Sequence, residues 1–162
     1  MQIETRRFGT LEVDEESTFA LTAGIPGFPD MRHVALLGAG TVPGQDRDGG
    51  EPAEHAMYWM QDVDDGDLAF LCIVPWVAFP EYDIEFDERA LGISDDADIR
   101  VLSLVTTHRE DGAAHLTANL RAPLVVDTRS RRMQQVILPD SRWPIRARFA
   151  ELVTSSSNDK AS

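Results

Sequence analysis

The chain has 162 residues, of which 43% are apolar and 27% charged, so it can bury the core of one globular domain. Its 28 acidic residues outnumber the 15 basic ones and give a formal net charge of −13 at pH 7. That balance argues against binding to nucleic acid, whose phosphates require Lys and Arg, and against anionic membrane surfaces. It favours a basic protein partner, which such a charge would attract and steer.

The scarcity of two residue types limits the chemistry further. The only lysine, Lys160, lies in the C-terminal tail, so the folded part has no lysine for a P-loop or a Schiff base. The only cysteine, Cys72, lies in an apolar run and cannot form an intramolecular disulfide. The N-terminal residues lack the apolar core of a signal peptide, and no apolar stretch approaches the roughly 18 residues of a membrane helix. We expect a soluble protein of the reducing cytoplasm, without a cofactor.

Short strands and turns are predicted from the N-terminus onward. Residues Gln2–Phe8 and Leu11–Val13 flank Gly9-Thr10 and predict an opening hairpin. The stretch that follows is rich in proline and glycine, which excludes a long helix. Within it we expect a tight turn whose side chains Ile25 and Phe28 plug the core.

Two further strands are predicted at His33–Leu37 and Met57–Gln61. The residues between them, 38–54, are rich in Gly, Pro and Asp and predict a mobile loop. Its Gly38-Ala39-Gly40 is no dinucleotide fingerprint, because that motif must open a helix and proline and glycine follow here.

The stretch from Leu68 to Asp87 organises the rest. Leu68–Val74 is an unbroken apolar run, typical of a strand covered on both faces. After it, apolar and acidic residues alternate, which predicts a second strand with its carboxylates on the outer face, about 7 Å apart. An acidic turn precedes Leu68; it is no calcium loop, because glycine falls fifth and Ile73 twelfth. The acids at the two ends of the run are Asp62, Asp64, Asp65, Asp67, Glu81, Asp83, Glu85 and Asp87.

The second half continues the β pattern. We expect a helical turn at 88–93, strands at Arg100–Thr107 and Met133–Leu138, a hairpin turn at Asp111-Gly112, and Leu116–Asp127 broken at Pro123. Roughly eight short strands predict a mostly β fold, a small antiparallel barrel with one or two helical turns. This single domain spans 1–150, and 151–162 form a disordered polar tail. Core positions are predicted at Phe70, Cys72, Val74, Leu102, Leu104, Leu120 and Val126.

Several motifs, in this order and over roughly Gln2 to Phe149, make the chain resemble the FliW family of bacterial flagellar assembly factors. The departure is the 38–54 loop, which is longer than in that family and leaves its edge contacts open. The motifs are Ile3-x-Thr5-x-x-Phe8-Gly9, Gly24-Ile25-Pro26-Gly27-Phe28, Asp64-Asp65 before Leu68-Ala69-Phe70, Pro75, Tyr82, Ala90-Leu91-Gly92, Val105-Thr106, Thr117-Ala118-Asn119-Leu120, Ala122-Pro123 and Gln135-x-Ile137-Leu138.

The resemblance implies a small β-barrel-like protein without enzymatic activity that binds cytoplasmic flagellin. It also implies that the free protein, once flagellin is exported, binds the RNA-binding repressor CsrA and relieves repression of flagellin translation. The acidic composition is compatible with this, since CsrA must be basic where it grips RNA. We expect a monomer that binds CsrA through the eight acids named above and flagellin around Ile25 and Phe28, with no metal and no direct contact to nucleic acid or membrane.

Other interpretations remain open at this point. The acidic row is also what a merely solvated strand face looks like. In an enzyme, Asp83 and Glu85 would be the first acid–base pair to try, as in a glycoside hydrolase. His108 and His115, with Asp111 between them, could bind a metal, although two exposed loop histidines are the simpler expectation. A nucleic-acid-binding barrel would stack bases on Trp59, Trp76 and Phe79 and use the basic cluster of Arg129, Arg131 and Arg132.

Overall fold

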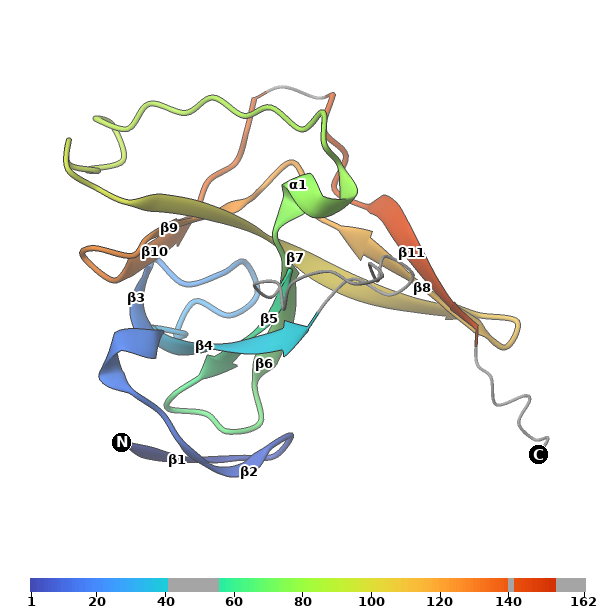
Figure 1. Cartoon of the computed structure of the whole chain (residues 1–162), viewed down its shortest axis with the longest axis horizontal. Helices are drawn as coiled ribbons and strands as arrows, with labels where there is room; N and C mark the ends of the chain where they lie inside the picture. The colour runs from blue at the N-terminus through green and yellow to red at the C-terminus, as the bar shows by residue number, and fades with distance from the viewer. Residues whose placement is uncertain (41–55, 140–141, 154–162) are drawn as a thin grey trace, which may run out of the picture.

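The computed structural model describes residues 1–40, 56–139 and 142–153, and these are almost entirely strands and turns (Figure 1). Most of the predicted 38–54 loop and most of the predicted tail therefore lie outside the described residues. The elements in chain order are β1 (Gln2–Thr5), β2 (Gly9–Glu12), the 3₁₀ turn η1 (Glu15–Ser17), β3 (Thr18–Thr22), β4 (His33–Gly40), β5 (Met57–Asp62), β6 (Ala69–Ile73), α1 (Pro75–Ala78), β7 (Ile99–Glu110), β8 (Ala113–Ala118), β9 (Leu124–Asp127), β10 (Arg132–Gln135) and β11 (Ala147–Val153).

Nine of these strands form one sheet that closes on itself. Its order is β11-β8-β7-β6-β5-β4-β3-β10-β9, and a further pairing of β7 with β9 closes a barrel of seven strands, β3 to β7 with β9 and β10. All neighbours are antiparallel except β10 and β3, which run parallel with Met133 opposite Leu21. The long strand β7 makes closure possible, because its residues 99–102 pair with β9, 103–105 with β6 and 105–110 with β8. The predicted small, mostly β barrel is confirmed.

The barrel encloses the main apolar core. Met60, Cys72 and Leu124 are fully buried there, and burying a side chain of this size contributes about 1.5–3 kcal/mol. The loop between β3 and β4 adds Ile25 and Met31 to the same cluster. Of the predicted core positions, Cys72, Leu102, Leu120 and Val126 are buried, whereas Phe70, Val74 and Leu104 are half-buried and pack against the cluster.

A second core lies outside the barrel, beneath α1 and the segment that follows it. Leu116, Leu120 and Leu138 are buried in this cluster together with Tyr82, and Phe79 and Trp143 pack against it. Strands β8 and β11, which extend beyond the barrel, supply one side of it (Figure 1). The segment after α1 therefore covers this second core, which is separate from the core inside the barrel.

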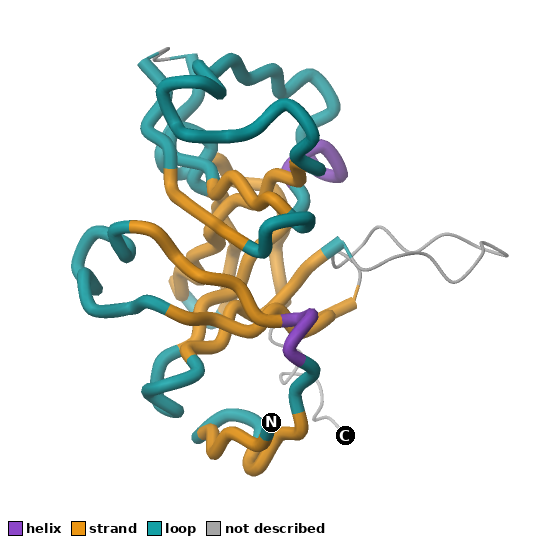
Figure 2. The backbone as a smooth tube through the Cα atoms, turned by 90° about the vertical axis from the view of Figure 1, so that its left-hand side faces the viewer, coloured by secondary structure: helices purple, strands orange, loops and turns teal. Residues whose placement is uncertain are grey.

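The hairpin β1–β2 forms a separate two-stranded sheet below the barrel (Figure 2). Ile3 packs with Val13 and Ala35, and the backbone N–H of Arg6 donates to the carbonyl of Gly66 (2.9 Å). A side chain at position 66 would collide with the Glu4 carbonyl oxygen, so glycine is required for this close approach. The predicted hairpin is confirmed, with its turn at residues 6–8 rather than at Gly9-Thr10.

Two sequence-based expectations are wrong in detail, and one strand was not expected. Residues 82–87 are extended but pair with no strand, since Tyr82 and two tryptophans hold their backbone instead of a ladder. The strand expected over Met133–Leu138 ends at Gln135. Strand β3, Thr18–Thr22, was not predicted, because its alternation is only five residues long and precedes a turn dense in glycine and proline.

Candidate partner-binding surface

The segment that carries the predicted acidic row is fixed to the second core by Tyr82. Helix α1 begins with Pro75 and ends within one turn, and the N–H of Tyr82 donates to the carbonyl of Phe79 (2.9 Å). The Tyr82 ring is 3% exposed, and its Oη donates to the carbonyl oxygen of Leu120 (2.6 Å). Burial raises the pKa of this phenol, so it stays protonated and keeps donating at physiological pH.

Two tryptophans hold the backbone on either side of that tyrosine. Trp76 Nε1 donates to the carbonyl of Tyr82 (2.6 Å), and Trp143 Nε1 donates to the carbonyl of Asp83 (3.0 Å). The rings of Tyr82 and Trp143 also meet edge to face at 4.8 Å, an arrangement that aromatic pairs favour. These contacts replace the missing strand partner and keep the segment extended.

The extended backbone produces the predicted alternation without a sheet. Tyr82 is buried and Ile84 and Phe86 half-buried, whereas the four acids between and beside them are exposed: Glu81, Asp83, Glu85 and Asp87. Within the described residues none of the four makes an ion pair. Asp87 accepts hydrogen bonds from the N–H groups of Arg89 and Ala90 and so caps the next turn. The other three carboxylates are available to a partner.

Apolar side chains adjoin this acidic segment. Trp76 and Val77 of α1 are 38% and 41% exposed, although both are large and apolar. Their exposure follows from the shortness of α1, which buries only Pro75. We call the combination of Trp76, Val77, Glu81, Asp83 and Glu85 the acidic–apolar surface; the alternation predicts its acids, but not its apolar half.

The second acidic group is partly structural. Asp62 is 4% exposed and accepts hydrogen bonds from the N–H groups of Asp64 (2.8 Å) and Asp65 (3.3 Å). Burial raises the pKa of Asp62, opposed by these two bonds and reinforced by the negative charges of Asp64 and Asp65. The expectation of Asp62 as a surface acid is therefore wrong, because it serves as the internal acceptor of its turn. Asp64, Asp65 and Asp67 are exposed as expected.

Gln61 secures the same turn from inside. Its Nε2 donates to the carbonyl oxygens of Asp62 (3.0 Å) and Leu68 (3.1 Å), and the Gln61 side chain is fully buried. The turn lies at the opposite end of β6 from α1 (Figure 1). The four steps between the first and last residues of this strand span roughly 13 Å. The two acidic groups therefore form two surfaces rather than one.

The two residues predicted to make apolar contacts with flagellin, Ile25 and Phe28, differ in their exposure to solvent. Ile25 is 5% exposed and belongs to the barrel core, so it offers nothing to a partner. Phe28 is 40% exposed and rests edge-on against Phe70, with ring centroids 5.1 Å apart. Gly24 makes this turn possible: its φ is +66°, and an added Cβ would lie 2.7 Å from the Phe28 carbonyl oxygen.

The residues on which the nucleic-acid-binding and enzyme interpretations depended have other contacts or surroundings in the fold. Trp59 is covered by the Arg7 guanidinium, 4.2 Å from the ring centroid, and Phe79 packs against Phe149. Burial raises the pKa of the Cys72 thiol to about 12, which removes its nucleophilic form at neutral pH. The side chains of Asp83 and Glu85 are both exposed to solvent. The part of the chain that the structure describes has no group of three acidic, His or Cys side chains placed to hold a metal ion.

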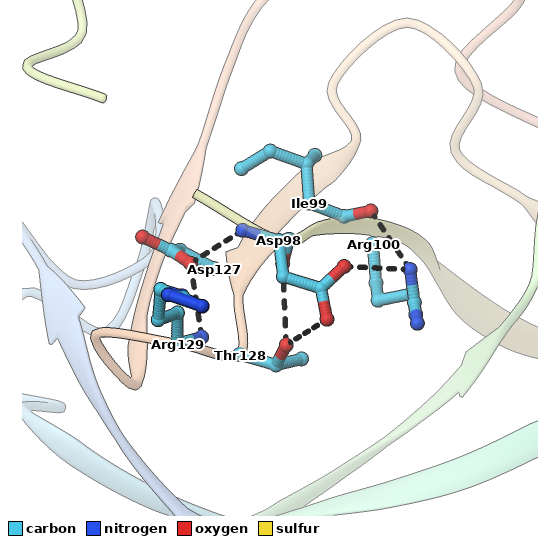
Figure 3. A network of polar contacts seen from close by, with 6 residues as sticks. All are labelled: Asp98, Ile99, Arg100, Asp127, Thr128 and Arg129. Atoms are coloured by element: carbon cyan, nitrogen blue, oxygen red, sulfur yellow. Dashed lines mark hydrogen bonds and ion pairs between the residues drawn. The ribbon is translucent and has the colours of Figure 1, made fainter. Parts of the chain in front are cut away.

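Two of the three clustered arginines contact acidic segments of the chain itself. Arg129 lies 3.9 Å from the Asp96 carboxylate, and Arg131 donates to the carbonyl of Glu15. Beside them, Asp127 accepts from the N–H groups of Asp98 and Arg129, which joins the start of β7 to the end of β9 (Figure 3). Burial would raise the pKa of Asp127, but hydrogen bonds, first from the Ser130 hydroxyl, lower it overall. This network lies at the seam of the barrel, by which we mean the junction of β7 and β9 that closes it. No sequence motif indicated the network.

A mainly apolar cavity of about 380 Å³ lies near this seam and was also not predicted. Phe19, Leu36, Tyr58 and Leu102 line it, with Arg100 at its edge. Because its lining residues come from five strands, β3, β4, β5, β7 and β9, no local sequence pattern could reveal it. Among the described helices, neither has the length or apolar character to traverse a bilayer.

Comparison with known proteins gives one consistent result. The family model described as "FliW protein" matches residues 2–149. The flagellar assembly factor FliW of Syntrophus aciditrophicus (strain SB) is 33% identical over 149 residues, covering 90% of this chain and 85% of that protein. FliW of Treponema pallidum (strain Nichols) is 34% identical over 146 residues, covering 88% and 87%.

A solved structure agrees with the sequence comparisons. The crystal structure of the flagellar assembly factor FliW superposes with a TM-score of 0.71 at 26% identity, covering 91% of this chain and 96% of that one. The barrel, its second core and the sequence matches thus lead to one assignment. The chain belongs to the FliW family of flagellar assembly factors.

Proposed function

We propose that this protein is a non-enzymatic, monomeric regulator in the cytoplasm that binds flagellin and, when free of it, binds and antagonises the translational repressor CsrA. Membership of the FliW family supports the general role. The observation that carries the CsrA half of the proposal is the acidic–apolar surface, where Glu81, Asp83 and Glu85 are exposed beside Trp76 and Val77 and form no ion pair with any described residue. A repressor that grips RNA must be basic there, and this surface complements it in charge.

The two halves of the surface have different tasks in this proposal. Exposed ion pairs contribute little affinity each, about 0–1 kcal/mol, but a cluster of them accelerates encounter with a basic partner. The exposed tryptophan and valine supply apolar area, and tryptophan is enriched among residues that dominate interface energies. The acids therefore set the association rate, and Trp76 with Val77 sets the dissociation rate.

Flagellin binding is assigned to a different place. Phe28 is half-exposed on the loop between β3 and β4 and is braced by Phe70, so it presents an apolar ring on a rigid support. We propose this ring as an anchor for flagellin, while Asp64, Asp65 and Asp67 remain exposed acids whose role in binding the repressor is secondary. Phe28→Ala should therefore weaken flagellin binding and leave CsrA binding unchanged.

The proposal is tested by reconstitution with purified components. CsrA is bound to flagellin leader RNA, and the protein is titrated in while RNA release is followed by fluorescence anisotropy. Release of RNA, its reversal by added flagellin, and no RNA binding by the protein alone are the expected results. Binding of RNA by the protein itself, or no effect on the CsrA–RNA complex, would contradict the proposal.

A further inference from the structure

The apolar cavity near the seam lies at one end of the barrel. Its volume of about 380 Å³ falls within the range of small-molecule pockets, about 300–1,000 Å³, and the mouths of β-barrels are a common place for them. Phe19 and Leu102 are buried in its lining, whereas Leu36, Tyr58 and Val74 are only half-buried. Apolar surface of these three side chains therefore remains in contact with water, and a ligand with an apolar body would gain free energy by covering it.

Two side chains of opposite charge stand at the rim of this cavity. Glu16 belongs to η1, just before β3, and Arg100 lies at the beginning of β7; both are exposed and both line the cavity. They form no ion pair with each other, and Glu16 forms none with any described residue. A ligand that carries both a cation and an anion can therefore complement the two charges at once.

The Arg100 side chain is held in place for such a contact. Its Nη1 donates to Asp98 Oδ1 (3.0 Å) and to the carbonyl of Ile99 (3.4 Å), and the Thr128 hydroxyl donates to Asp98 Oδ2 (2.9 Å) (Figure 3). The N–H groups on Nε and Nη2 of Arg100 have no hydrogen-bond partner among the described residues, so they can donate to a ligand carboxylate. Asp98 is the opposing negative charge here, but both of its oxygens already accept hydrogen bonds.

The Glu16 side of the rim suits an ammonium group. Asp14 and Glu15, which precede Glu16 in the same turn, are exposed as well and reinforce the negative potential. The opposing positive charge is Arg131, which donates to the carbonyl of Glu15. The Ser17 hydroxyl also lines the cavity, has no hydrogen-bond partner among the described residues and provides a second acceptor for an ammonium group.

We propose that this cavity binds a free α-amino acid with an apolar side chain, of the size of leucine to phenylalanine. The side chain of the ligand covers Leu36, Tyr58 and Val74. Its carboxylate accepts hydrogen bonds from Arg100, and its ammonium group donates to Glu16. An apolar carboxylic acid would leave Glu16 without a counter-charge, and an apolar amine would leave the free N–H groups of Arg100 unused. The formal charge of −13 also repels a free anion, but not a zwitterion, which has no net charge.

Titration of the full-length protein, followed by its amide chemical shifts, tests the ligand class. The probes share one phenylethyl body: L-phenylalanine, 3-phenylpropionate, which lacks the ammonium group, and phenethylamine, which lacks the carboxylate. We expect saturable binding of phenylalanine with shifts centred on the cavity lining, and affinity about tenfold weaker for each of the other two, because each loses a charge-assisted hydrogen bond. L-Serine has the same charges but no apolar body, and should cause no saturable shift.

Variants of the rim and of the lining test the assigned contacts. Glu16→Gln should bind phenylalanine about tenfold more weakly and 3-phenylpropionate as well as wild type does, a split that mere structural damage would not produce. Glu15→Gln changes the preceding acid of the same turn, which lies outside the cavity lining, and is the matched control with unchanged affinities. Leu36→Trp should fill the cavity and abolish phenylalanine binding, and Leu36→Phe, a smaller change in volume, should weaken it severalfold. Circular dichroism establishes that each variant is folded.

Similar affinity for all three phenylethyl probes would overturn the proposal, because the charges at the rim would then take no part in binding. So would phenylalanine binding of wild-type strength in the folded Leu36 variants, or equal weakening by Glu15→Gln and Glu16→Gln. The absence of saturable shifts with up to about 10 mM phenylalanine, which nearly saturates even a millimolar site, would overturn it as well.

Discussion

Replacing Asp62 tests whether the acidic turn depends on this residue as a hydrogen-bond acceptor or on its negative charge. Asp62→Ala removes the acceptor for the N–H groups of Asp64 and Asp65 at a site that is 4% exposed. Leaving such groups unsatisfied costs about 1–3 kcal/mol, which corresponds to a melting temperature lower by roughly 2–10 °C for a chain of this size. Asp62→Asn keeps an oxygen acceptor and removes the buried charge, so its melting temperature should equal or exceed that of the wild type at neutral pH.

The pH dependence of the free energy of unfolding shows whether the negative charge of Asp62 stabilises or destabilises the fold. The pKa of Asp62 is raised in the fold, so the folded protein binds this proton more tightly than the unfolded chain does. The stability that Asp62 contributes is therefore full below its unfolded pKa, near 3.9, and is lost as pH rises through the higher folded value. Going from pH 7 toward pH 4, wild type should gain stability relative to Asp62→Asn.

Thermal unfolding followed by circular dichroism, at pH 7 and at pH 4.5, checks both expectations, and the difference between the two proteins cancels the titration of the other acids. If Asp62→Asn is as unstable as Asp62→Ala at pH 7, the negative charge itself holds the turn and our reasoning is refuted.

Three further predictions concern the fold. Tyr82→Phe removes the hydrogen bond to the Leu120 carbonyl, which should cost about 1–3 kcal/mol and speed tryptic cleavage at Arg89; unchanged cleavage would mean that the tryptophans alone fix the segment. Leu124→Ala should cost about 2–5 kcal/mol in urea unfolding and more than Phe70→Ala, because Leu124 is fully buried and Phe70 only half-buried; the reverse order would contradict the assigned core. Gly66→Ala should cost about 1–3 kcal/mol and raise hydrogen exchange in β1, since its Cβ meets the Glu4 carbonyl; wild-type exchange would show that the hairpin docks without this contact.

Sequence patterns of short range predicted most of the architecture. The apolar run through Cys72 appears as β6, and Asp111-Gly112 closes the β7–β8 hairpin as expected. Both signals are local, since they depend on alternation or on turn residues within a few positions. Closure of the barrel, by contrast, depends on β7 pairing with β9 and on β10 running parallel to β3, which no local pattern specifies.

In the candidate surface, too, some features follow from local sequence patterns and others depend on residues far apart in the sequence. Alternation correctly predicted which side chains of residues 82–87 point outward, because an extended backbone produces it with or without a strand partner. It could not predict that Trp76 and Trp143 take the place of that partner, since Trp143 is about 60 residues away. Nor could charge alone reveal that Asp62 is buried, because the hydrogen bonds that permit it come from the turn geometry.

The most direct test of the proposed function is the association rate with CsrA after charge reversal. Asp83→Lys with Glu85→Lys changes the surface by four unit charges, and one unit acting on a partner charge about 10 Å away in water is worth about 0.4 kcal/mol. We therefore predict roughly tenfold slower association at low salt, little difference near 1 M salt, where the Debye length is about 3 Å, and unchanged folding. Asp64→Lys with Asp67→Lys, an equal charge change at the other end of β6, should have a much smaller effect. Association of the Asp83/Glu85 variant at the wild-type rate in low salt would contradict the account and leave the acidic segment as a solvated face.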